Sequence, residues 1–205
     1  MTGETNGKTK QSQRAPDGTE IDWQKAQEGT KLLLEAVGAD PEREELHDTW
    51  ARRVPQTFET LTEGTRTAAK PTLRTFPVEE SNPVVKTGIP LYSLCEHHLL
   101  PYHGVAHVAY VPDGEVVGLS KLPRYVRWQS RQLTMQESLT RDIATGLYDE
   151  LGAVGVVVEI SATHLCEAMR GVERSTTTTT RSVSGDVSET VVQQFERAID
   201  NDSNI

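Results

Sequence analysis

The chain has 205 residues and carries 30 acidic against 21 basic side chains, which gives a net charge of −9 at pH 7. This length accommodates one compact domain with extensions, and an acidic chain without a basic stripe is not typical of a nucleic-acid-binding protein. The sequence has no apolar run of the roughly 20 residues that a membrane span needs, and its first residues lack the apolar core of a signal peptide. We therefore expect no membrane contact and a cytoplasmic location.

The first 70 residues divide into a polar tail and a helical segment. Residues 1–20 are rich in Thr, Gly, Gln and Lys, a composition that predicts a disordered tail. Within residues 21–70, Asp22 suits the N-cap of a helix that ends at Gly38. Pro41 is expected at the first position of a second helix, and Pro55 interrupts the helical pattern that follows.

Residues 71–205 form the predicted main domain, in which strands and helices are interspersed. Thr134 and Glu137 have the spacing of a capping box at the start of one helix. Met135, Leu139 and Ile143 begin an apolar repeat of four residues along that helix. The expected strands are 72–78, 84–94, 104–112, 154–166 and 175–183, and the expected helices are 121–130 (capped by Ser120), 134–152 and 188–201. This order predicts an α+β fold.

The two cysteines, Cys95 and Cys166, each have histidine neighbours, and two cysteines make a poor disulfide framework. Cys95 and His98 are three residues apart and would meet on one face of a helical turn. Cys166 and His164 are two apart at the end of a predicted strand, where their side chains would face the same way.

Together, Cys95, His98 and Cys166 would give zinc two thiolates and an imidazole, with the open fourth position that is typical of a catalytic site. Such a site makes water a usable nucleophile near neutral pH, and His97 and His164 would be candidates for proton transfer. The alternative is a buried, inert Cys166 with ordinary turn histidines. The spacing alone leaves both interpretations open.

Four stretches of the sequence favour the zinc site over an inert Cys166. They follow one another within roughly residues 90–185. They are SLCEHHLLPYHGVAHVAYVP, VVGLSKLPRYV, MQESLTRDIA and HLCEAMRGV. They resemble GTP cyclohydrolase I of the zinc-dependent type IA family. That family hydrolyses GTP at C8 of guanine, releases formate and forms 7,8-dihydroneopterin triphosphate. The resemblance implies a tunnelling fold (T-fold), an antiparallel sheet with two helices on one face, and a ring-shaped homo-oligomer, a decamer in the family, with active sites between subunits.

The resemblance also implies roles for individual residues. Zn²⁺ would be bound by Cys95, His98 and Cys166; His97 and His164 would be catalytic; and the substrate GTP would be bound by Ser120, Lys121, Arg124, Glu137 and Arg170. Glu137 would accept hydrogen bonds from guanine N1–H and the 2-amino group, which a carboxylate can do. The alternatives are a capping role for Glu137 and a solvated helix face for Lys121 and Arg124. Either Arg52 or Arg53 would contact the phosphate site of a neighbouring subunit, and the sequence does not indicate which.

Two other functions fit parts of the sequence. A T-fold nitrile reductase would use a thiolate nucleophile, and its chemistry does not call for the paired Cys/His arrangement. An inert binding module with a structural zinc would need a fourth ligand, which His97 could supply. The sequence does not indicate which pathway would use the product.

Overall fold

The computed structural model of the protein describes residues 20–66 and 69–202. Residues 1–19 of the predicted tail lie outside the described residues. Within the described part of the chain, no helix combines the length and apolar character needed to cross a membrane. The division into segments at residues 20 and 70 stays a prediction.

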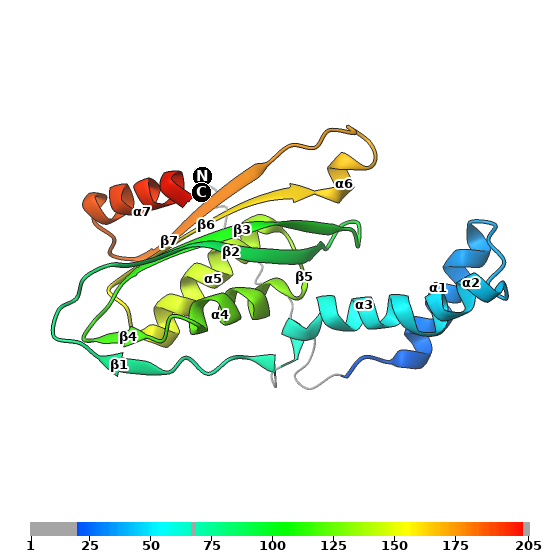
Figure 1. Ribbon diagram of the computed structural model, residues 1–205, viewed down its shortest axis with the longest axis horizontal. Helices are drawn as coiled ribbons and strands as arrows, with labels where there is room; N and C mark the ends of the chain where they lie inside the picture. The colour runs from blue at the N-terminus through cyan, green and yellow to red at the C-terminus, as the bar shows by residue number, and fades with distance from the viewer. Residues whose placement is uncertain (1–19, 67–68, 203–205) are drawn as a thin grey trace, which may run out of the picture.

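The N-terminal segment is helical, as expected, and lies to one side of the sheet (Figure 1). It comprises α1 (Trp23–Ala36), α2 (Glu44–Asp48), a π-helical stretch (Thr49–Arg53), α3 (Val54–Leu61) and a short 3₁₀ turn (Glu63–Thr65). Asp22 caps α1 as predicted, because its carboxylate accepts a hydrogen bond from the Lys25 backbone N–H at 3.0 Å. Pro55 is at the second position of α3, where its missing N–H costs no helical hydrogen bond.

The predicted helix start at Pro41 is wrong, since α2 begins only at Glu44. The Asp40 side chain accepts from the Glu42 backbone N–H at 3.0 Å, and the Asp40 carbonyl accepts from the Arg43 N–H at 3.3 Å. These two hydrogen bonds form a turn in place of the first helical residues. Asp side chains commonly stabilise turns in this way.

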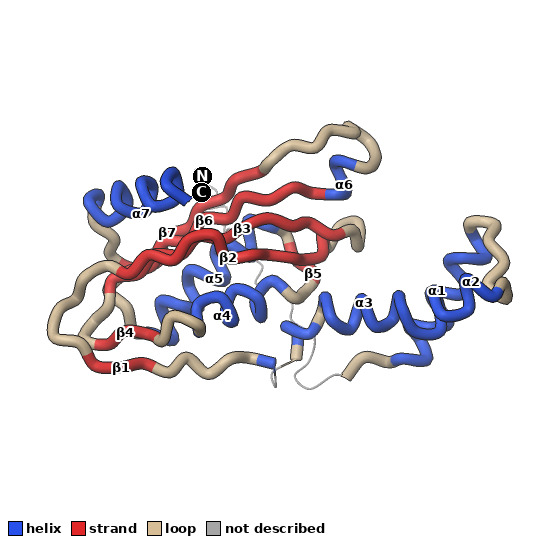
Figure 2. The backbone as a smooth tube through the Cα atoms, viewed as in Figure 1, coloured by secondary structure: helices blue, strands red, loops and turns tan. Residues whose placement is uncertain are grey.

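The main domain is built on a five-stranded sheet with the order β5-β2-β3-β6-β7 (Figure 2). Its strands are β2 (Val84–Cys95), β3 (Pro101–Val111), β5 (Leu133–Thr134), β6 (Gly155–His164) and β7 (Thr178–Gly185). All neighbouring pairs are antiparallel except β5 with β2. A separate two-stranded sheet pairs β1 (Thr75–Pro77) with β4 (Glu115–Val117). β1, β2, β3, β6 and β7 overlap the strands that β-branched and aromatic residues predicted, whereas β4 and β5 were not predicted.

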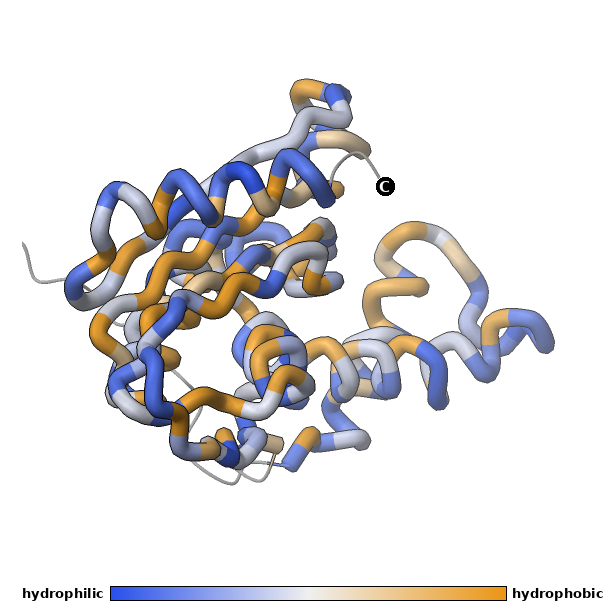
Figure 3. The backbone as a smooth tube through the Cα atoms, turned by 60° about the vertical axis from the view of Figure 1, so that its left-hand side comes forward, coloured by the Kyte–Doolittle hydropathy of each residue, from blue (hydrophilic) through white to orange (hydrophobic). Residues whose placement is uncertain are grey.

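Helices α4 (Lys121–Ser130) and α5 (Gln136–Leu151) cover one face of the sheet, and α7 (Glu189–Asp202) lies on the opposite face (Figure 1). The predicted four-residue repeat is confirmed in α5 for Leu139, Ile143 and Leu147, which are all buried in the main core. Its first member, Met135, precedes the helix and is exposed. On the other face, Phe195 of α7 packs against Ala109 and Val157. Hydrophobic residues accordingly recur along the strands in Figure 3. The predicted α+β class and the pair of helices on one face are confirmed.

Two predicted helix caps are not formed. Thr134 belongs to β5, where it pairs with Cys95, and its hydroxyl donates to the Met135 carbonyl at 3.1 Å. The N-cap of α5 is therefore Met135, and the capping box of Thr134 with Glu137 is wrong. Ser120 precedes α4 with helical torsions (φ −73°, ψ −13°) and makes no side-chain cap hydrogen bond. An N-cap residue normally has extended torsions, which Ser120 lacks.

Candidate metal centre and active site

Cys95 and His98 meet at the turn between β2 and β3. Cys95 is the last residue of β2, and its carbonyl accepts from the backbone N–H groups of His98 at 3.3 Å and Leu99 at 2.9 Å. This single helical turn places residues three apart on the same side. The Cys95 Sγ atom consequently lies 3.6 Å from His98 Nδ1.

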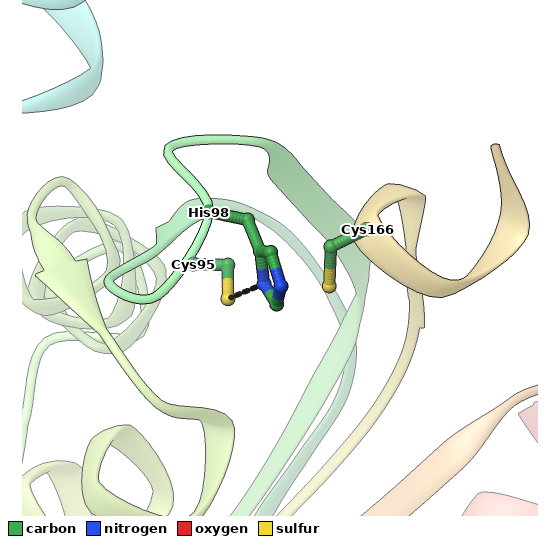
Figure 4. A group of neighbouring side chains, drawn as sticks. All are labelled: Cys95, His98 and Cys166. Carbon is green, nitrogen blue, oxygen red and sulfur yellow. Dashed lines mark hydrogen bonds between the residues drawn. The ribbon is translucent and has the colours of Figure 1, made fainter. Parts of the chain in front are cut away.

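Cys166 also lies at this site, but on a helix and not on the strand that the sequence predicted. We expected it at the end of a strand, but β6 ends at His164 and Cys166 lies in the short helix α6 (Leu165–Ala168). The inferred same-side orientation of His164 and Cys166 on one strand is therefore wrong. The turn of α6 nevertheless directs the Cys166 thiol toward Cys95 and His98 (Figure 4).

The donor atoms of Cys95, His98 and Cys166 all lie within 4.8 Å of one another. Within the described residues, this is the one group of three or more His, Cys, Asp or Glu side chains that converge so closely. Burial raises the pKa of the Cys166 thiol, and the neighbouring Cys95 sulfur raises it further. A bound cation would offset both effects, because metal coordination favours the thiolate. The three donors thus fit a metal ion.

His97 lies outside this group. Its side chain is exposed, its ring centroid is 6.2 Å from that of His98, and its Nε2 atom is 4.0 Å from the Glu96 carboxylate. The residues that the structure describes therefore do not assemble the four-ligand site that a structural zinc would require. A three-donor group leaves room for water or a substrate.

His164 is half-buried beside the three-donor group, at the end of β6. Its Nε2 atom is 2.7 Å from Gln136 Oε1, and its ring stacks on Tyr102 with centroids 4.6 Å apart. Burial lowers the pKa of His164, while the negative charges of Glu137 and Glu167 oppose that shift. His164 is thus an ionisable group held in a fixed place, without belonging to the metal-binding group.

Glu137 and Arg170 lie at the same end of the domain as the metal centre. Glu137 is exposed in the first turn of α5 and is close enough to influence the pKa of His164. Arg170 is exposed two residues beyond α6. Both side chains are therefore available to a ligand that approaches this end.

Ser120, Lys121 and Arg124 lie at the opposite end of α4. The helix starts beside β4, and its last residues adjoin β5, the strand that pairs with Cys95 (Figure 1). Ten helical residues span about 15 Å. Within one chain, the structure therefore does not bring the predicted phosphate-binding residues to the metal centre.

Arg52 and Arg53 are also not placed at the centre. They lie in the N-terminal segment, and both pair with Asp48, at 3.0 and 3.6 Å. The choice between them stays open.

Sequence reasoning missed Gln136 and Tyr102, which both contact His164. Gln136 begins α5 and is 1% exposed, and Tyr102 in β3 is fully buried. Gln136 directly precedes Glu137 in the MQES stretch, which was the available signal. A polar residue four positions before Thr140 on the buried face of an amphipathic helix is unusual enough to indicate a role.

The comparisons with known proteins agree with this geometry. A family model described as GTP cyclohydrolase I matches residues 26–200. A protein named GTP cyclohydrolase 1 from Hyperthermus butylicus is 47% identical over 166 residues, covering 81% of this chain and 84% of its own. Proteins of the same name from Clostridium perfringens and Chlorobaculum tepidum are 44% and 45% identical, covering 78% and 82% of this chain and 88% and 77% of their own. A solved structure of an archaeosine synthase QueF-Like protein aligns at a TM-score of only 0.42 with 16% identity, over 54% of this chain and 100% of its own, which is too weak to carry an inference.

Proposed function

The chain belongs to the GTP cyclohydrolase I family, and from this premise we propose that it hydrolyses GTP at C8 of guanine, releases formate and forms 7,8-dihydroneopterin triphosphate. The observation that carries the proposal is the convergence of Cys95, His98 and Cys166 at one end of an α+β domain. The nitrile reductase alternative does not account for this group of three metal donors. The structural-zinc alternative lacks its fourth ligand, since His97 lies outside the group.

We assign Zn²⁺ to Cys95, His98 and Cys166. Two sulfur donors and one imidazole are a ligand set that suits zinc, and three protein donors leave a position open. A bound zinc ion supplies Lewis acidity, which makes water a usable nucleophile near neutral pH.

His164 is the proposed proton donor to N7 of guanine, which makes C8 a better electrophile. Burial lowers the pKa of its imidazolium and so makes it a stronger acid, and its ring is held in place by Gln136 and Tyr102. His97 is exposed on the turn beside His98 and is assigned to proton transfer in the later ribose steps. General acid–base catalysis of this kind typically contributes about 10²–10⁴-fold.

Glu137 is the proposed guanine-binding residue. A carboxylate offers two acceptor oxygens to the two donors at guanine N1 and the 2-amino group. With the capping box absent from the structure, the carboxylate has no capping role that would compete with this one. Its proximity to His164 places base recognition beside proton transfer.

The triphosphate site is proposed to form between two copies of the chain. Ser120, Lys121 and Arg124 lie roughly 9–15 Å along α4 from its end that adjoins the metal centre, and a second copy would bring them to the triphosphate. Arg170, at the metal end, would complete the phosphate contacts. Arginine and lysine are the residues that bind phosphate groups most readily.

A ring-like homo-oligomer, a decamer by analogy with the family, would supply that second copy. In the described residues, β7 is the last strand of the sheet, and β5 pairs with β2 only at Leu94 and Cys95. Both edges therefore keep open backbone groups that favour pairing with another chain.

Incubation of the purified protein with GTP tests the function directly. We expect stoichiometric release of formate and, after oxidation, a fluorescent pterin. The Cys166→Ala variant is the matched control and should form neither product. Absence of both products with the wild-type protein loaded with zinc would overturn the proposed function.

A further inference from the structure

Gln136 has both ends of its side-chain amide engaged, although it is buried at the start of α5. Its amide nitrogen lies 3.0 Å from the Ile160 carbonyl, 2.9 Å from the Thr178 carbonyl and 3.1 Å from Thr180 Oγ1. Carbonyl oxygens only accept hydrogen bonds, so the nitrogen end of the amide must face them. The reverse orientation would place the amide oxygen against two carbonyl oxygens.

The hydroxyl groups around Gln136 fit the same orientation. The Thr140 hydroxyl donates to the Gln136 backbone carbonyl at 2.7 Å, and the Thr140 and Thr180 hydroxyl oxygens are 2.6 Å apart. Because the Thr140 proton is used on Gln136, Thr180 must donate to Thr140. Thr180 Oγ1 is then an acceptor for the Gln136 amide nitrogen. Each hydroxyl proton in this network thus has one consistent direction.

The oxygen end of the Gln136 amide consequently faces His164. Oε1 lies 2.7 Å from His164 Nε2 and can only accept. His164 Nε2 must therefore carry a hydrogen, and in the neutral imidazole the lone pair is on Nδ1. The hydrogen bond made by one ring nitrogen sets which nitrogen is protonated.

Tyr102 fixes the plane of the same ring. Tyr102 and His164 are cross-strand partners in β3 and β6, and their rings stack at 4.6 Å with an interplanar angle of 12°. Tyr102 is fully buried, so it cannot move aside without disturbing the core. Rotation of the His164 ring out of this plane would lose the stacking, and a half-turn of the ring would lose the hydrogen bond to Gln136.

We propose that Gln136 is a positioning residue that holds His164 in the tautomer protonated at Nε2, with Tyr102 fixing the ring plane, so that His164 exchanges its catalytic proton through Nδ1. The catalytic part of this inference rests on the proposed function, in which His164 transfers a proton to GTP. The tautomer itself follows from the hydrogen bonds of Gln136 alone.

The tautomer is tested by ¹⁵N spectra of histidine-labelled, zinc-loaded protein, with the His164 signals assigned by their loss in His164→Gln. We expect the neutral form of the His164 ring to carry its hydrogen on Nε2. A ring protonated at Nδ1, or a mixture of both tautomers, would overturn the proposal. The spectrum needs no GTP, so an inactive wild-type protein would overturn the proposed function without affecting this result.

The catalytic consequence is tested with Gln136→Met, which keeps the side-chain length and removes the amide. We expect kcat to fall about 10–100-fold, by analogy with the loss of a group that orients a metal-bound histidine, with KM for GTP and zinc content unchanged. The His164 spectrum should change to a mixture of tautomers. A variant with wild-type kcat would overturn the positioning role.

Gln132→Met is the matched control. Gln132 is also buried, and its amide donates to the Gln129 carbonyl at 2.7 Å, so the variant carries a similar packing and hydrogen-bond loss. We expect lower stability and a wild-type kcat. Equal kcat losses in both variants would show a general repacking effect and contradict the positioning role. If Gln136→Met does not fold, the wild-type spectrum still decides the tautomer.

Discussion

Three side chains from two distant parts of the chain form the candidate metal centre. Cys95 and His98 are placed by the turn after β2, while Cys166 is placed by α6, 71 residues later in the sequence. A site of this kind exists only in the folded protein. Metal binding is therefore linked to folding, and the loss of one donor should affect both.

The variant His98→Ala should lose stoichiometric zinc and GTP turnover together, because two thiolates alone do not complete the three-donor site. Metal content is measured on the purified protein by elemental analysis, alongside formate release. His103→Ala is the matched control, since His103 is an exposed histidine of β3 outside the group of three. A His98→Ala protein with full zinc and full turnover would rule out the three-ligand site.

Glu137 is the residue that would distinguish guanine from other bases. Glu137→Gln replaces one acceptor oxygen with a donor that would face the donors of guanine. Bound guanine would cover this donor, and a donor left unpaired away from water costs about 1–3 kcal/mol, so kcat/KM for GTP should fall about 5–150-fold. The preference of the wild-type protein for GTP over ITP, which lacks the 2-amino group, should shrink in the variant.

The control for Glu137→Gln is Glu189→Gln, a change of the same type in the first turn of α7. A carboxylate in the first helical turn stabilises a helix by about 0.3–1 kcal/mol, and both variants should lose this contribution. Only Glu137→Gln should change the preference for GTP over ITP, measured as the ratio of the two kcat/KM values. Unchanged discrimination would show that Glu137 does not bind the base.

At the scale of helices and strands, most of the main domain could be predicted from local patterns. The strands at β2, β3, β6 and β7 follow their β-branched and aromatic residues, and α5 follows its four-residue apolar repeat. The errors occur where tertiary contacts decide the local structure. Thr134 remains a strand residue because it pairs with Cys95, so the capping box does not form.

The candidate site was predictable in its donor residues but not in its supporting contacts. Cys95, His98 and Cys166 could be named from residue chemistry and family resemblance, yet the strand expected at Cys166 is a short helix. The place of Gln136 beside Glu137 marked it as a residue of interest but did not predict its contact with His164, because the two are 28 residues apart and meet only when α5 packs on β6. Long-range contacts of this kind are not encoded in a short stretch of sequence.

The contact of α7 with the sheet contains a buried histidine with a consequence for stability. His107 of β3 is buried, and its Nδ1 atom accepts from the Gly88 backbone N–H at 3.3 Å. Burial lowers the pKa of His107, and the charges of Glu159 in β6 and Asp202 in α7 oppose this shift only in part. Glu159 is itself paired with Arg181 of β7. The folded protein thus favours the neutral form of His107.

Stability should therefore fall as the pH decreases below about 6.5, the usual pKa of histidine. At pH values between the lowered pKa of His107 in the folded protein and about 6.5, the unfolded state binds more protons than the folded state. The free energy of unfolding therefore rises with pH in this range and becomes level above about pH 6.5. One group contributes at most about 1.4 kcal/mol per pH unit. Denaturant unfolding at several pH values measures this slope.

His107→Asn removes the titrating group and keeps an acceptor for Gly88, so the slope should be smaller than in the wild type. His103→Asn, at an exposed position of the same strand, should leave it unchanged. Proton release on metal binding affects all three proteins equally and cancels in the comparison. Equal slopes in the wild type and His107→Asn would contradict the assignment.

At the scale of the whole molecule, a single chain carries the two halves of the proposed site at opposite ends of α4. It also exposes apolar side chains on the N-terminal helices, where Leu33 and Val37 are 65% and 71% exposed beside a groove of about 510 Å³. Exposed apolar surface and open sheet edges both favour association with further copies. If the proposed function is correct, the complete site forms only when copies of the chain associate.

Subunit mixing tests this requirement. Cys166→Ala lacks the metal half, and Lys121→Ala/Arg124→Ala lacks the phosphate half, so each alone should be inactive. If every site takes its two halves from neighbouring copies, co-expression at equal levels should restore about a quarter of the sites, because one combination in four joins two intact halves. Co-expression of Cys166→Ala with His98→Ala, both defective in the metal half, should restore none. If both halves came from the same chain, every site would carry one defect. Mixed assemblies would then be no more active than the separate variants, and this result would contradict a site shared between copies.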